Sequence, residues 1–561
     1  MIVPTDKQLI PTEQPIGTPQ RSDSVLSGLN WFDDRAAAMG LCITAGKGSG
    51  KSTLIGKELV FHNWLKGFGQ ILLDPLGGSI DQLLDRLIRY GQQLSPKARK
   101  QLWQRVRFVD MGGAYGTVTP WPLYYRLENE SCYQVAQRYL EIVRRIDPNI
   151  TNAPIQGWNP LHELASQSGI VLSSLDGFQV PDIETMLRGI RNKNATWKHH
   201  LAVASERYPH EVPEAVAFLQ NEYAKMSGAE RRRVYGSLHT KLRLFAEPTF
   251  KAMFGSSQPG IDWTQVIEDG ILVLIDFRHV VTADQRQFLM LMVFLNFIDF
   301  IRRRGPGKHH KKVGFVVDEL TTLTNQDLQG DSDIFSSDLD DLINVLARNN
   351  GVMVTLALQE AWQVSERILN SLRSCGNLIQ GVSSHPDSAL DVAKSLFPYD
   401  PRYIRRKQPV YAGDPPEVID FNVTYFSPPE WYASMSQAIQ KLKTFRFLVR
   451  GAQREGDFTG SIKPMSIEHL IPIVAVDAEK VAWVRRKLAL RDGIPIEDIF
   501  QEIETRRQPI QPRGTVTAKR DVSTAKDSAT VVQNETVQPG ANQSQDSDQP
   551  ESKVDERDFF N

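Results

Sequence analysis

The sequence predicts an α/β protein with a mainly parallel sheet and an all-helical domain inserted into it. Two observations predict this fold class. Short apolar runs, bounded by turn formers or charged residues, recur along the chain and alternate with helical periodicity, which is typical of buried parallel strands. The segment 126–245 breaks that rhythm, because it holds helical stretches and no comparable apolar run. The predicted strands lie within 41–45, 70–74, 106–110, 270–277, 313–319, 352–359 and 377–382.

Composition divides the 561-residue chain into five parts. Residues 1–30 are rich in Pro, Thr and Gln and are expected to form an extended arm. Residues 31–125 and 246–507 form the two parts of the sheet domain, on either side of the helical insertion 126–245. The second part ends in strands and helices: 444–450 alternates like an edge strand, and Asp477 is placed to cap a helix. Residues 508–561 have the composition of a disordered tail.

Charge and apolar content exclude several classes of protein. The formal net charge is -1, so any nucleic-acid or membrane binding must come from local patches. Three scattered cysteines favour neither a disulfide framework nor a zinc site. The N-terminus has no signal-peptide pattern. The most apolar run, 288–301, is too short to cross a bilayer and predicts a buried helix. We therefore expect a cytoplasmic protein with no transmembrane segment of its own.

The segment AGKGSGKST (45–53) fits the phosphate-loop pattern, with Ala45 at its first position. Its glycines let backbone N–H groups turn towards phosphate oxygens, and the helix that follows presents its positive end to the same anion. Lys51 is expected to reach the β- and γ-phosphates of ATP, and Ser52 to offer its hydroxyl to Mg²⁺. The residues expected to bind the nucleotide are Ala45, Gly46, Lys47, Gly48, Ser49, Gly50, Lys51, Ser52 and Thr53.

Polar residues follow two of the predicted strands. In VVDEL (316–320), two acids stand at the carboxyl end of a strand, where ligands of open α/β sheets bind. Asp318 is expected to hold Mg²⁺ and Glu319 to polarise the attacking water. Gln359 ends the next strand; it could sense the γ-phosphate or orient water, or simply close the strand. Arg348 precedes that strand, a position where exposed arginines are also routine.

Three basic clusters could contact nucleic-acid phosphates, although solvated helix ends would look the same. They are Arg231–Arg233, Arg302–Arg304 with Lys308 to Lys312, and Lys193 with Trp197, Lys198 and two histidines. The third cluster places an aromatic residue among cations, which is a composition that single-strand binders use.

These motifs resemble the FtsK/HerA superfamily of ring-forming DNA pumps, and most closely the coupling-protein ATPases of conjugative type IV secretion. The likeness extends over about residues 17 to 500. The segments that carry it are LNWFDDR (29–35), the phosphate loop, LLDPLGG (72–78), WPL (121–123), FKAMFG (250–255), DWTQVIEDGILVLIDF (262–277), VVDEL, LARNNGVMVTLALQ (346–359) and RDGIPIEDIFQEIETR (491–506).

The resemblance implies a RecA-like sheet, a homo-hexamer and catalysis by Glu319, Lys51, Arg348 and Gln359. Arg348 matches the family's arginine finger, which acts on the nucleotide of a neighbouring subunit. The helical insertion corresponds to the domain that meets DNA or relaxosome proteins. Three features depart from the family: LLDPLGG lacks charges that often follow DP, the stretch after Glu319 is longer and acidic, and N-terminal membrane helices are missing.

The resulting hypothesis is an ATP-driven DNA translocase in conjugative transfer, for which peripheral attachment to the membrane would come through secretion-channel proteins. Two alternatives stay open. One is a HerA-like DNA pump in repair or phage packaging. The other is a nucleotide-gated scaffold that couples substrates to a secretion channel without moving DNA.

Overall fold

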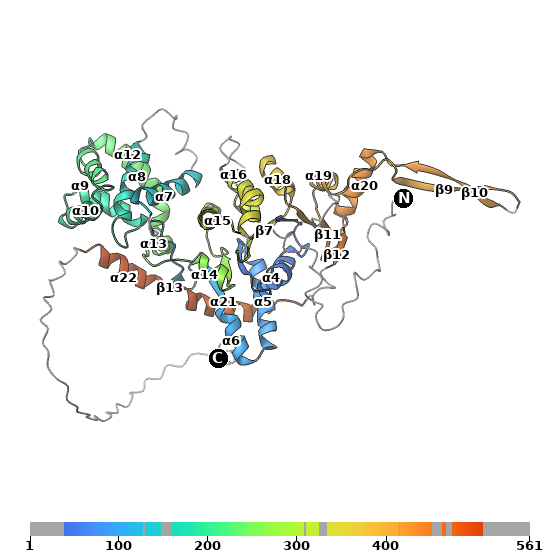
Figure 1. Cartoon of the computed structure of the whole chain (residues 1–561), viewed down its shortest axis with the longest axis horizontal. Coiled ribbons are helices and arrows are strands. Elements are labelled where there is room, and N and C mark those ends of the chain that lie inside the picture. The colour runs from blue at the N-terminus through green and yellow to red at the C-terminus, as the bar shows by residue number, and fades with distance from the viewer. Residues whose placement is uncertain are drawn as a thin grey trace, which may run out of the picture.

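The computed structural model of the chain describes residues 39–126, 130–146, 160–307, 310–324, 334–414, 416–450, 463–466 and 474–508. The predicted N-terminal arm (1–30) and residues 509–561 of the predicted tail lie outside them. The described residues form an elongated molecule, with a central sheet between a group of helices and a protruding β-hairpin (Figure 1).

A nine-stranded sheet forms the centre, in the order β12-β11-β8-β1-β7-β6-β2-β5-β3. The seven strands from β8 to β3 are parallel, whereas β11 and β12 are antiparallel additions at one edge. The predicted fold class, a mainly parallel RecA-like sheet with a helical insertion, is confirmed. The strands are β1 (Leu41–Thr44), β2 (Gly69–Asp74), β3 (Val106–Asp110), β5 (Leu272–Asp276), β6 (Val313–Val317), β7 (Val352–Leu358), β8 (Asn377–Gln380), β11 (Arg446–Arg450) and β12 (Lys463–Ser466).

The prediction of an edge strand at 444–450 was wrong. β11 lies between β8 and β12 and pairs with both. The alternation was read correctly as a strand, but the outer strand β12 was not anticipated. A strand's own residues do not say how many neighbours pair with it, because main-chain groups make that pairing.

Helices cover both faces of the sheet, which explains why its seven parallel strands are almost wholly buried. One face carries the helix 51–65, α5 (Gly78–Gln92), α6 (Pro96–Gln104) and α21 (Ala478–Asp492). The helix 51–65 comprises α3 (Lys51–Thr53), a π-helical segment (Leu54–Val60) and α4 (Phe61–Leu65). Asp477 caps α21 by accepting a hydrogen bond from the backbone N–H of Lys480, as predicted.

The other face carries α15 (Ala283–Arg304), the longest helix that the structure describes there, with α14 (Trp263–Glu268), α16 (Ile334–Asp341), α17 (Ala347–Asn350) and α18 (Glu366–Arg373). The apolar run 288–301 lies in α15 and is buried, as predicted. Its polar Asn296 accepts a hydrogen bond from Trp263 Nε1 (2.7 Å). Among the described residues, no helix combines the length and the apolarity needed to cross a bilayer.

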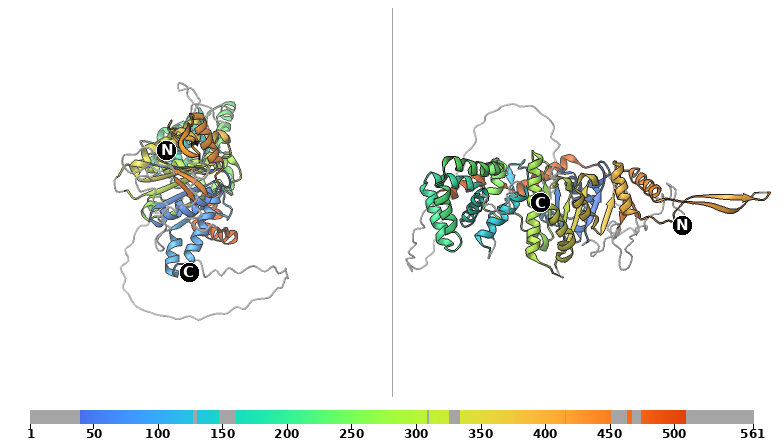
Figure 2. Two further views of the ribbon diagram at one scale, coloured as in Figure 1. Left: turned by 90° about the vertical axis from the view of Figure 1, so that its right-hand side faces the viewer. Right: turned by 90° about the horizontal axis from the view of Figure 1, so that it is seen from above.

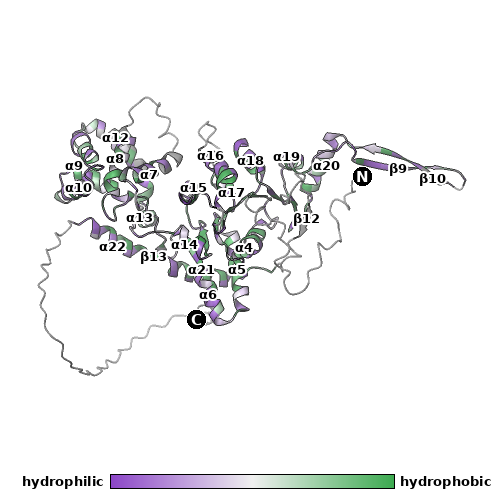
Figure 3. Cartoon of the chain, viewed as in Figure 1, coloured by the Kyte–Doolittle hydropathy of each residue, from purple (hydrophilic) through white to green (hydrophobic). Residues whose placement is uncertain are grey.

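The inserted region contains helices and no strand in its described residues, 130–146 and 160–246. Its helices are α7 (Cys132–Ile146), α8 (Pro160–Ser173), α9 (Ile183–Arg191), α10 (Ala195–Arg207), α11 (Pro213–Ala217) and α12 (Gly228–Leu242). It follows the short strand β4 (Thr117–Val118) and leads into α13 (Pro248–Gly255). Figure 3 shows hydrophilic residues on the outer sides of these helices.

The C-terminal helix α22 (Ile496–Arg506) ties the insertion to the sheet domain. It follows β13 (Ile494–Pro495), which pairs with β4, and Figure 1 shows it running beside the helical insertion. Arg506 Nη2 and Arg507 Nε each donate to a different oxygen of the buried Asp182 carboxylate, both at 2.7 Å. Two charge-assisted hydrogen bonds on one buried acid hold the end of α22 against the insertion.

A β-hairpin projects from the opposite end of the molecule (Figures 1 and 2). It consists of β9 (Ile404–Ala412) and β10 (Glu417–Tyr425) and was not anticipated from the sequence. It lies between α19 (Pro386–Leu396) and α20 (Pro428–Gln440), which pack around a small core of their own that includes Trp431 and Met435.

Candidate nucleotide site

The phosphate-loop segment connects β1 to α3 at the carboxyl edge of the parallel strands. Gly48 (φ 78°) and Gly50 (φ 93°) adopt left-handed conformations that favour glycine. The start of the loop is fixed to its neighbours, since the N–H groups of Ala45 and Gly46 donate to the carbonyls of Leu358 (3.1 Å) and Val382 (2.7 Å). The loop is therefore pinned between β7 and β8 and leads directly into a helix N-terminus.

Phe445 covers the end of this loop. Its N–H donates to the carbonyl of Ser49 (2.8 Å), and Phe445 itself has a left-handed φ of 63°. Its ring lies so close to Gly50 that a Cβ placed there would overlap Cδ1 of the ring. Gly50 is thus required both by its backbone conformation and by the ring against it. Phe445 was not anticipated from the sequence, because it lies 395 positions after Gly50.

We expect Gly50→Ala to destabilise the nucleotide-free protein more than Gly48→Ala. Both positions have positive φ, which costs an alanine about 1–2 kcal/mol. A Cβ at Gly48 would meet nothing within 4 Å, whereas at Gly50 it overlaps Phe445, and overpacking adds about 1–3 kcal/mol. Urea unfolding of the two variants measures the difference. Equal losses of unfolding free energy would show that the Phe445 ring moves aside at no cost.

Lys51 joins the loop to the acidic pair predicted after β6. Its Nζ lies 3.0 Å from Asp318 Oδ1 and 2.9 Å from Glu319 Oε2. All three side chains are nearly buried, with exposed fractions of 7–11%. Burial disfavours the ammonium, but the two carboxylates outweigh it and raise the pKa of Lys51. The lysine is therefore held charged at the loop, where a polyphosphate would compete with the two carboxylates for its ammonium group.

Glu319 is the most constrained residue of the group. It has φ 61° and ψ 64°, a left-handed conformation that is uncommon in residues with a side chain. Its Oε2 accepts from Gln359 Nε2 (2.9 Å) as well as from Lys51, and its Oε1 accepts from Thr321 Oγ1 (2.7 Å). The structure thus brings Glu319 and Gln359 together at the carboxyl ends of β6 and β7. Thr321 is a contact that the sequence analysis did not single out.

Hydroxyl and carboxylate oxygens converge beside Lys51. Ser79 Oγ donates to Asp318 Oδ2 (2.6 Å), and a Cβ at Gly78 would lie 3.4 Å from Ser52 Oγ. The start of α5 therefore lies next to both Ser52 and Asp318. Oxygen donors of this kind suit Mg²⁺, which binds through one or two protein groups together with substrate phosphates. Ser52 and Asp318 fit the ion, while Ser79 orients the carboxylate.

Four neighbouring strands, β6, β2, β5 and β3, end in or are followed by buried aspartates. These are Asp318, Asp74, Asp276 and Asp110, with exposed fractions of 5% or less. Arg278 donates to Asp276 and also binds Asp81 and the carbonyl of Gly77. Asp74 instead accepts hydrogen bonds from the backbone N–H groups of Leu76, Gly77 and Ile80. Burial, followed by the nearby charge of Asp318, raises the pKa of Asp74 to about 7.

This raised pKa predicts a pH dependence of stability. An aspartate in the unfolded chain titrates near pH 4, so between about pH 4 and 7 only folded Asp74 retains its proton. Its stabilising contribution is complete below pH 4 and is lost as pH rises through 7. We expect the free energy of unfolding to fall more steeply with pH in wild type than in Asp74→Asn, by up to about 1.4 kcal/mol per pH unit. Parallel urea titrations at several pH values check this, and identical slopes would contradict it.

Arg348 lies far from the loop of its own chain. It is exposed in α17, before the amino end of β7, whereas Gln359 follows the carboxyl end. A seven-residue strand separates them by roughly 23 Å. Arg348 therefore cannot join Lys51 and Glu319 within one chain and could act only on another subunit.

The described parts of the basic clusters are less available than the sequence suggests. Arg302, Arg303 and Arg304 form ion pairs, with Asp338 and Asp341, Asp299 and Glu268 respectively. In the third cluster, Trp197 and His200 are buried, at 4% and 0% exposed, so Trp197 presents no open ring face to a base. Trp197 instead packs edge-on against Phe178. Lys308 and the side chains of Arg231–Arg233 lie outside what the structure describes.

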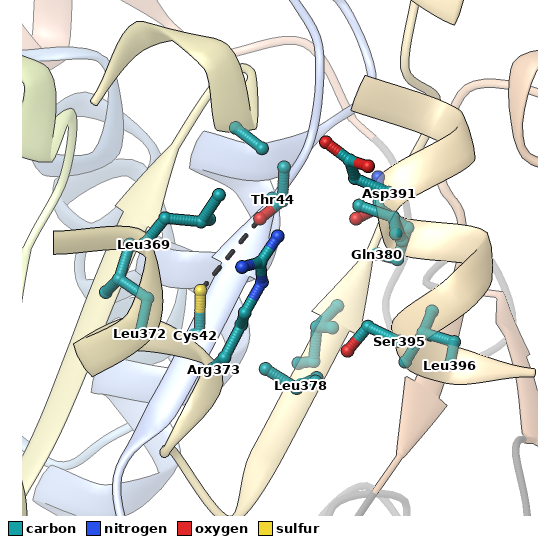
Figure 4. A pocket seen from close by; sticks show the side chains of 13 residues that line it. Cys42, Thr44, Leu369, Leu372, Arg373, Leu378, Gln380, Asp391, Ser395 and Leu396 are labelled. Atoms are coloured by element: carbon teal, nitrogen blue, oxygen red, sulfur yellow. Dashed lines mark hydrogen bonds between the residues drawn. The ribbon is translucent and has the colours of Figure 1, made fainter. Parts of the chain in front are cut away.

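A separate hollow lies beside β1 and β8, on the face covered by α18 and α19. Its volume is only about 50 Å³, too small for a nucleotide. Figure 4 shows Cys42 and Thr44 of β1 with Leu369 and Leu372 of α18 around it, and leucines supply much of the lining. It is a packing gap, distinct from the loop and acids described above.

Comparison with known proteins gives distant structural similarities. No protein-family model matches the chain, and no curated protein matches it. The chain is similar to the unbound bacterial conjugative coupling protein TrwBdeltaN70, with 14% identity over 77% of this chain and 85% of that one, at a TM-score of 0.45. Plasmid coupling protein TrwB in complex with ADP and Mg²⁺ is also 14% identical, over 79% and 87%, with a TM-score of 0.45. VirB4 of Thermoanaerobacter pseudethanolicus is 11% identical, over 79% and 91%, with a TM-score of 0.41.

Proposed function

We propose that this chain is an ATP-hydrolysing motor that moves DNA in conjugative transfer or type IV secretion. The observation that carries the ATPase part is the convergence of Lys51, Asp318, Glu319 and Gln359 beside a glycine loop that opens a helix. The DNA part is supported by the motifs that resemble the FtsK/HerA superfamily, from LLDPLGG through LARNNGVMVTLALQ.

Each group has a separate role in this proposal. The backbone N–H groups of the loop after Gly46 and the Lys51 ammonium bind the phosphates. Ser52 and Asp318 hold Mg²⁺, which neutralises phosphate charge. When ATP binds, Lys51 exchanges Glu319 for phosphate oxygens, and the carboxylate becomes free to accept a proton from the attacking water. Gln359, hydrogen bonded to Glu319, orients that water or senses the γ-phosphate.

Glu319→Gln is expected to bind ATP·Mg²⁺ and to turn over at least about 10²-fold more slowly, the scale of losing a positioned general base. The amide keeps the size of the side chain but cannot take up the proton. Phosphate release and nucleotide-induced thermal shift measure the two properties separately. Glu366→Gln, on the exposed start of α18, is the matched control and should behave as wild type. Loss of ATP binding in a folded Glu319→Gln protein would make Glu319 a ligand or structural residue instead.

DNA is the substrate that distinguishes a motor from a nucleotide-gated scaffold. A motor should hydrolyse ATP faster when single- or double-stranded DNA is added, whereas a scaffold should not respond. The Glu319→Gln variant gives the background rate for this comparison. DNA-independent turnover would leave the ATPase assignment intact and reject DNA translocation. Assembly into a homo-hexamer, and docking on secretion-channel or relaxosome proteins, belong to the same proposal by resemblance.

A further inference from the structure

The turn before β11 holds Phe445 in an unusual backbone conformation. The Arg446 N–H donates to the carbonyl of Lys443 (3.0 Å), so Phe445 is the third residue of a four-residue turn. Its φ is 63°, and a positive φ at that turn position normally calls for glycine or asparagine. A bulky side chain disfavours this conformation. Strain of this kind persists only where the surroundings enforce it, and it is concentrated at functional sites.

The strained position lies at the proposed nucleotide site. Among the residues that the structure describes, three besides glycines have a positive φ: Lys193, Glu319 and Phe445. The Glu319 carboxylate binds Lys51, and the Phe445 N–H binds the carbonyl of Ser49. Two of the three strained residues therefore contact the phosphate loop directly, which relates the conformation of Phe445 to that loop.

Phe445 fixes the direction of one peptide unit in the loop. Its N–H donates to the Ser49 carbonyl at 2.8 Å. Ser49 is only 1% exposed, so water is a poor substitute for this donor. In a planar trans peptide, the carbonyl and the N–H of the next residue point in opposite directions. Because the Ser49 carbonyl points towards Phe445, the Gly50 N–H points away from it.

The Gly50 N–H belongs to the start of the helix that follows the loop. The Leu54 N–H donates to the Gly50 carbonyl (3.0 Å), which closes the first helical turn. The first four N–H groups of a helix, here those of Gly50 and Lys51 to Thr53, have no partner within the helix. Groups of this kind bind the anion in a phosphate loop. The direction of the Gly50 N–H therefore decides whether the site has four such donors or three.

Gly50 alone does not fix that direction. It has φ 93° and ψ 15°, but glycine adopts positive and negative φ about equally readily. Rotation of the Ser49–Gly50 peptide would turn the N–H out of the site, and a glycine does not resist it. The Phe445 ring lies directly against Gly50, where a Cβ would overlap it. The hydrogen bond to Ser49 and this ring together select one orientation of the peptide.

We propose that Phe445 is a positioning residue for the phosphate site. It holds the Ser49–Gly50 peptide so that the Gly50 N–H already faces the phosphates before the nucleotide binds. This inference rests on the proposed ATPase function, and it assigns Phe445 to phosphate binding and not to the base or to the chemical step. Donors fixed in advance need no rearrangement when the anion arrives. They hold the phosphates in the ground state and in the transition state alike, so the gain is in affinity and not in kcat.

Three substitutions separate the backbone of Phe445 from its ring. Phe445→Tyr keeps both. Phe445→Gly removes the ring and adopts a positive φ freely, whereas Phe445→Ala removes the ring and disfavours that φ. We expect the affinity for tripolyphosphate with Mg²⁺, measured by calorimetry, to be unchanged in Phe445→Tyr and lower in Phe445→Gly. It should be lowest in Phe445→Ala, by at least about tenfold, the loss expected for one hydrogen bond to a charged group.

ATP·Mg²⁺ is the second probe. If Phe445 acts on the phosphates, Phe445→Ala weakens ATP and tripolyphosphate by the same factor and raises KM with little change in kcat. Glu319→Gln, in contrast, should lower kcat and leave binding intact. Phe426→Ala is the matched control, because it removes a partly buried ring that packs against the separate core around Trp431. It should leave both affinities at their wild-type values.

Three results would overturn the proposal, each in samples that circular dichroism shows to be folded. Equal affinity of wild type and Phe445→Ala for tripolyphosphate would make Phe445 a packing residue. A loss of affinity confined to ATP would place the ring against the base instead. Equal losses in Phe445→Gly and Phe445→Ala would show that the left-handed backbone plays no part. A wild-type protein that binds neither ligand would contradict the proposed function and this inference together, whereas the other results bear on Phe445 alone.

Discussion

Replacing Lys51 with Ala is expected to abolish ATP hydrolysis and to weaken nucleotide binding. In the structure Lys51 is the cation that touches both Asp318 and Glu319, at 3.0 and 2.9 Å. Without it, the phosphates of ATP would approach two nearly buried carboxylates with no lysine between them. The same loss leaves the carboxylates unpaired, a situation that typically costs about 3–5 kcal/mol. The variant should therefore also melt at a lower temperature than wild type in the absence of nucleotide.

Phosphate release and nucleotide-induced thermal shift measure the two effects, at a temperature where circular dichroism shows the variant folded. Lys66→Ala provides the matched control, because Lys66 is exposed just after α4, the end of the helix that Lys51 begins. Near-normal turnover in a pure Lys51→Ala preparation would show that the loop is not the catalytic phosphate site.

Arg348→Ala is expected to bind ATP normally and to hydrolyse it about 10³-fold more slowly, the scale of an arginine finger acting from a neighbouring subunit. The reason is geometric: Arg348 and Gln359 lie at opposite ends of β7, so the guanidinium cannot reach the loop of its own chain. Because Arg348 is exposed, its guanidinium can reach the loop of another subunit. Added to wild type, the variant should lower turnover by more than its share of the subunits.

Mixing Arg348→Ala with Lys51→Ala gives the sharper result. The first variant keeps an intact loop and the second keeps an intact Arg348, so some interfaces in mixed rings should combine both and recover activity. Turnover per chain that does not change with protein concentration, together with no recovery in the mixture, would mean that Arg348 has no role across subunits.

The parallel strands could be predicted because both of their faces are buried, which makes each a continuous apolar run that a sequence displays directly. The hairpin formed by β9 and β10 could not be recognised in this way. β9 contains Arg405 to Lys407 and Pro409, and it has no buried face that would produce an apolar pattern. The edge assignment of β11 failed for a different reason. Its neighbour β12 pairs with it through main-chain groups, and the alternation of side chains in β11 gives no information about that pairing.

The site shows the same limit. Lys51, Ser52, Asp318 and Glu319 could be placed together because a loop and a strand end follow known patterns. Ser79 and Phe445 are brought there by the fold and carry no local signal, whereas Thr321 reaches its near neighbour in sequence, Glu319, through an ordinary hydroxyl. Trp197 shows the opposite error, because an aromatic residue among lysines looks like a surface for bases until its burial against Phe178 is known.

The most direct test of the ATPase assignment is phosphate release from ATP by the purified chain, with Mg²⁺ and with the ion removed by chelation. We expect the wild-type protein to release phosphate when Mg²⁺ is present. We expect the rate to fall to background when the ion is chelated, and also when Glu319 is replaced by Gln. A folded wild-type protein that releases no phosphate at any protein concentration, and whose melting temperature ATP·Mg²⁺ leaves unchanged, would contradict it.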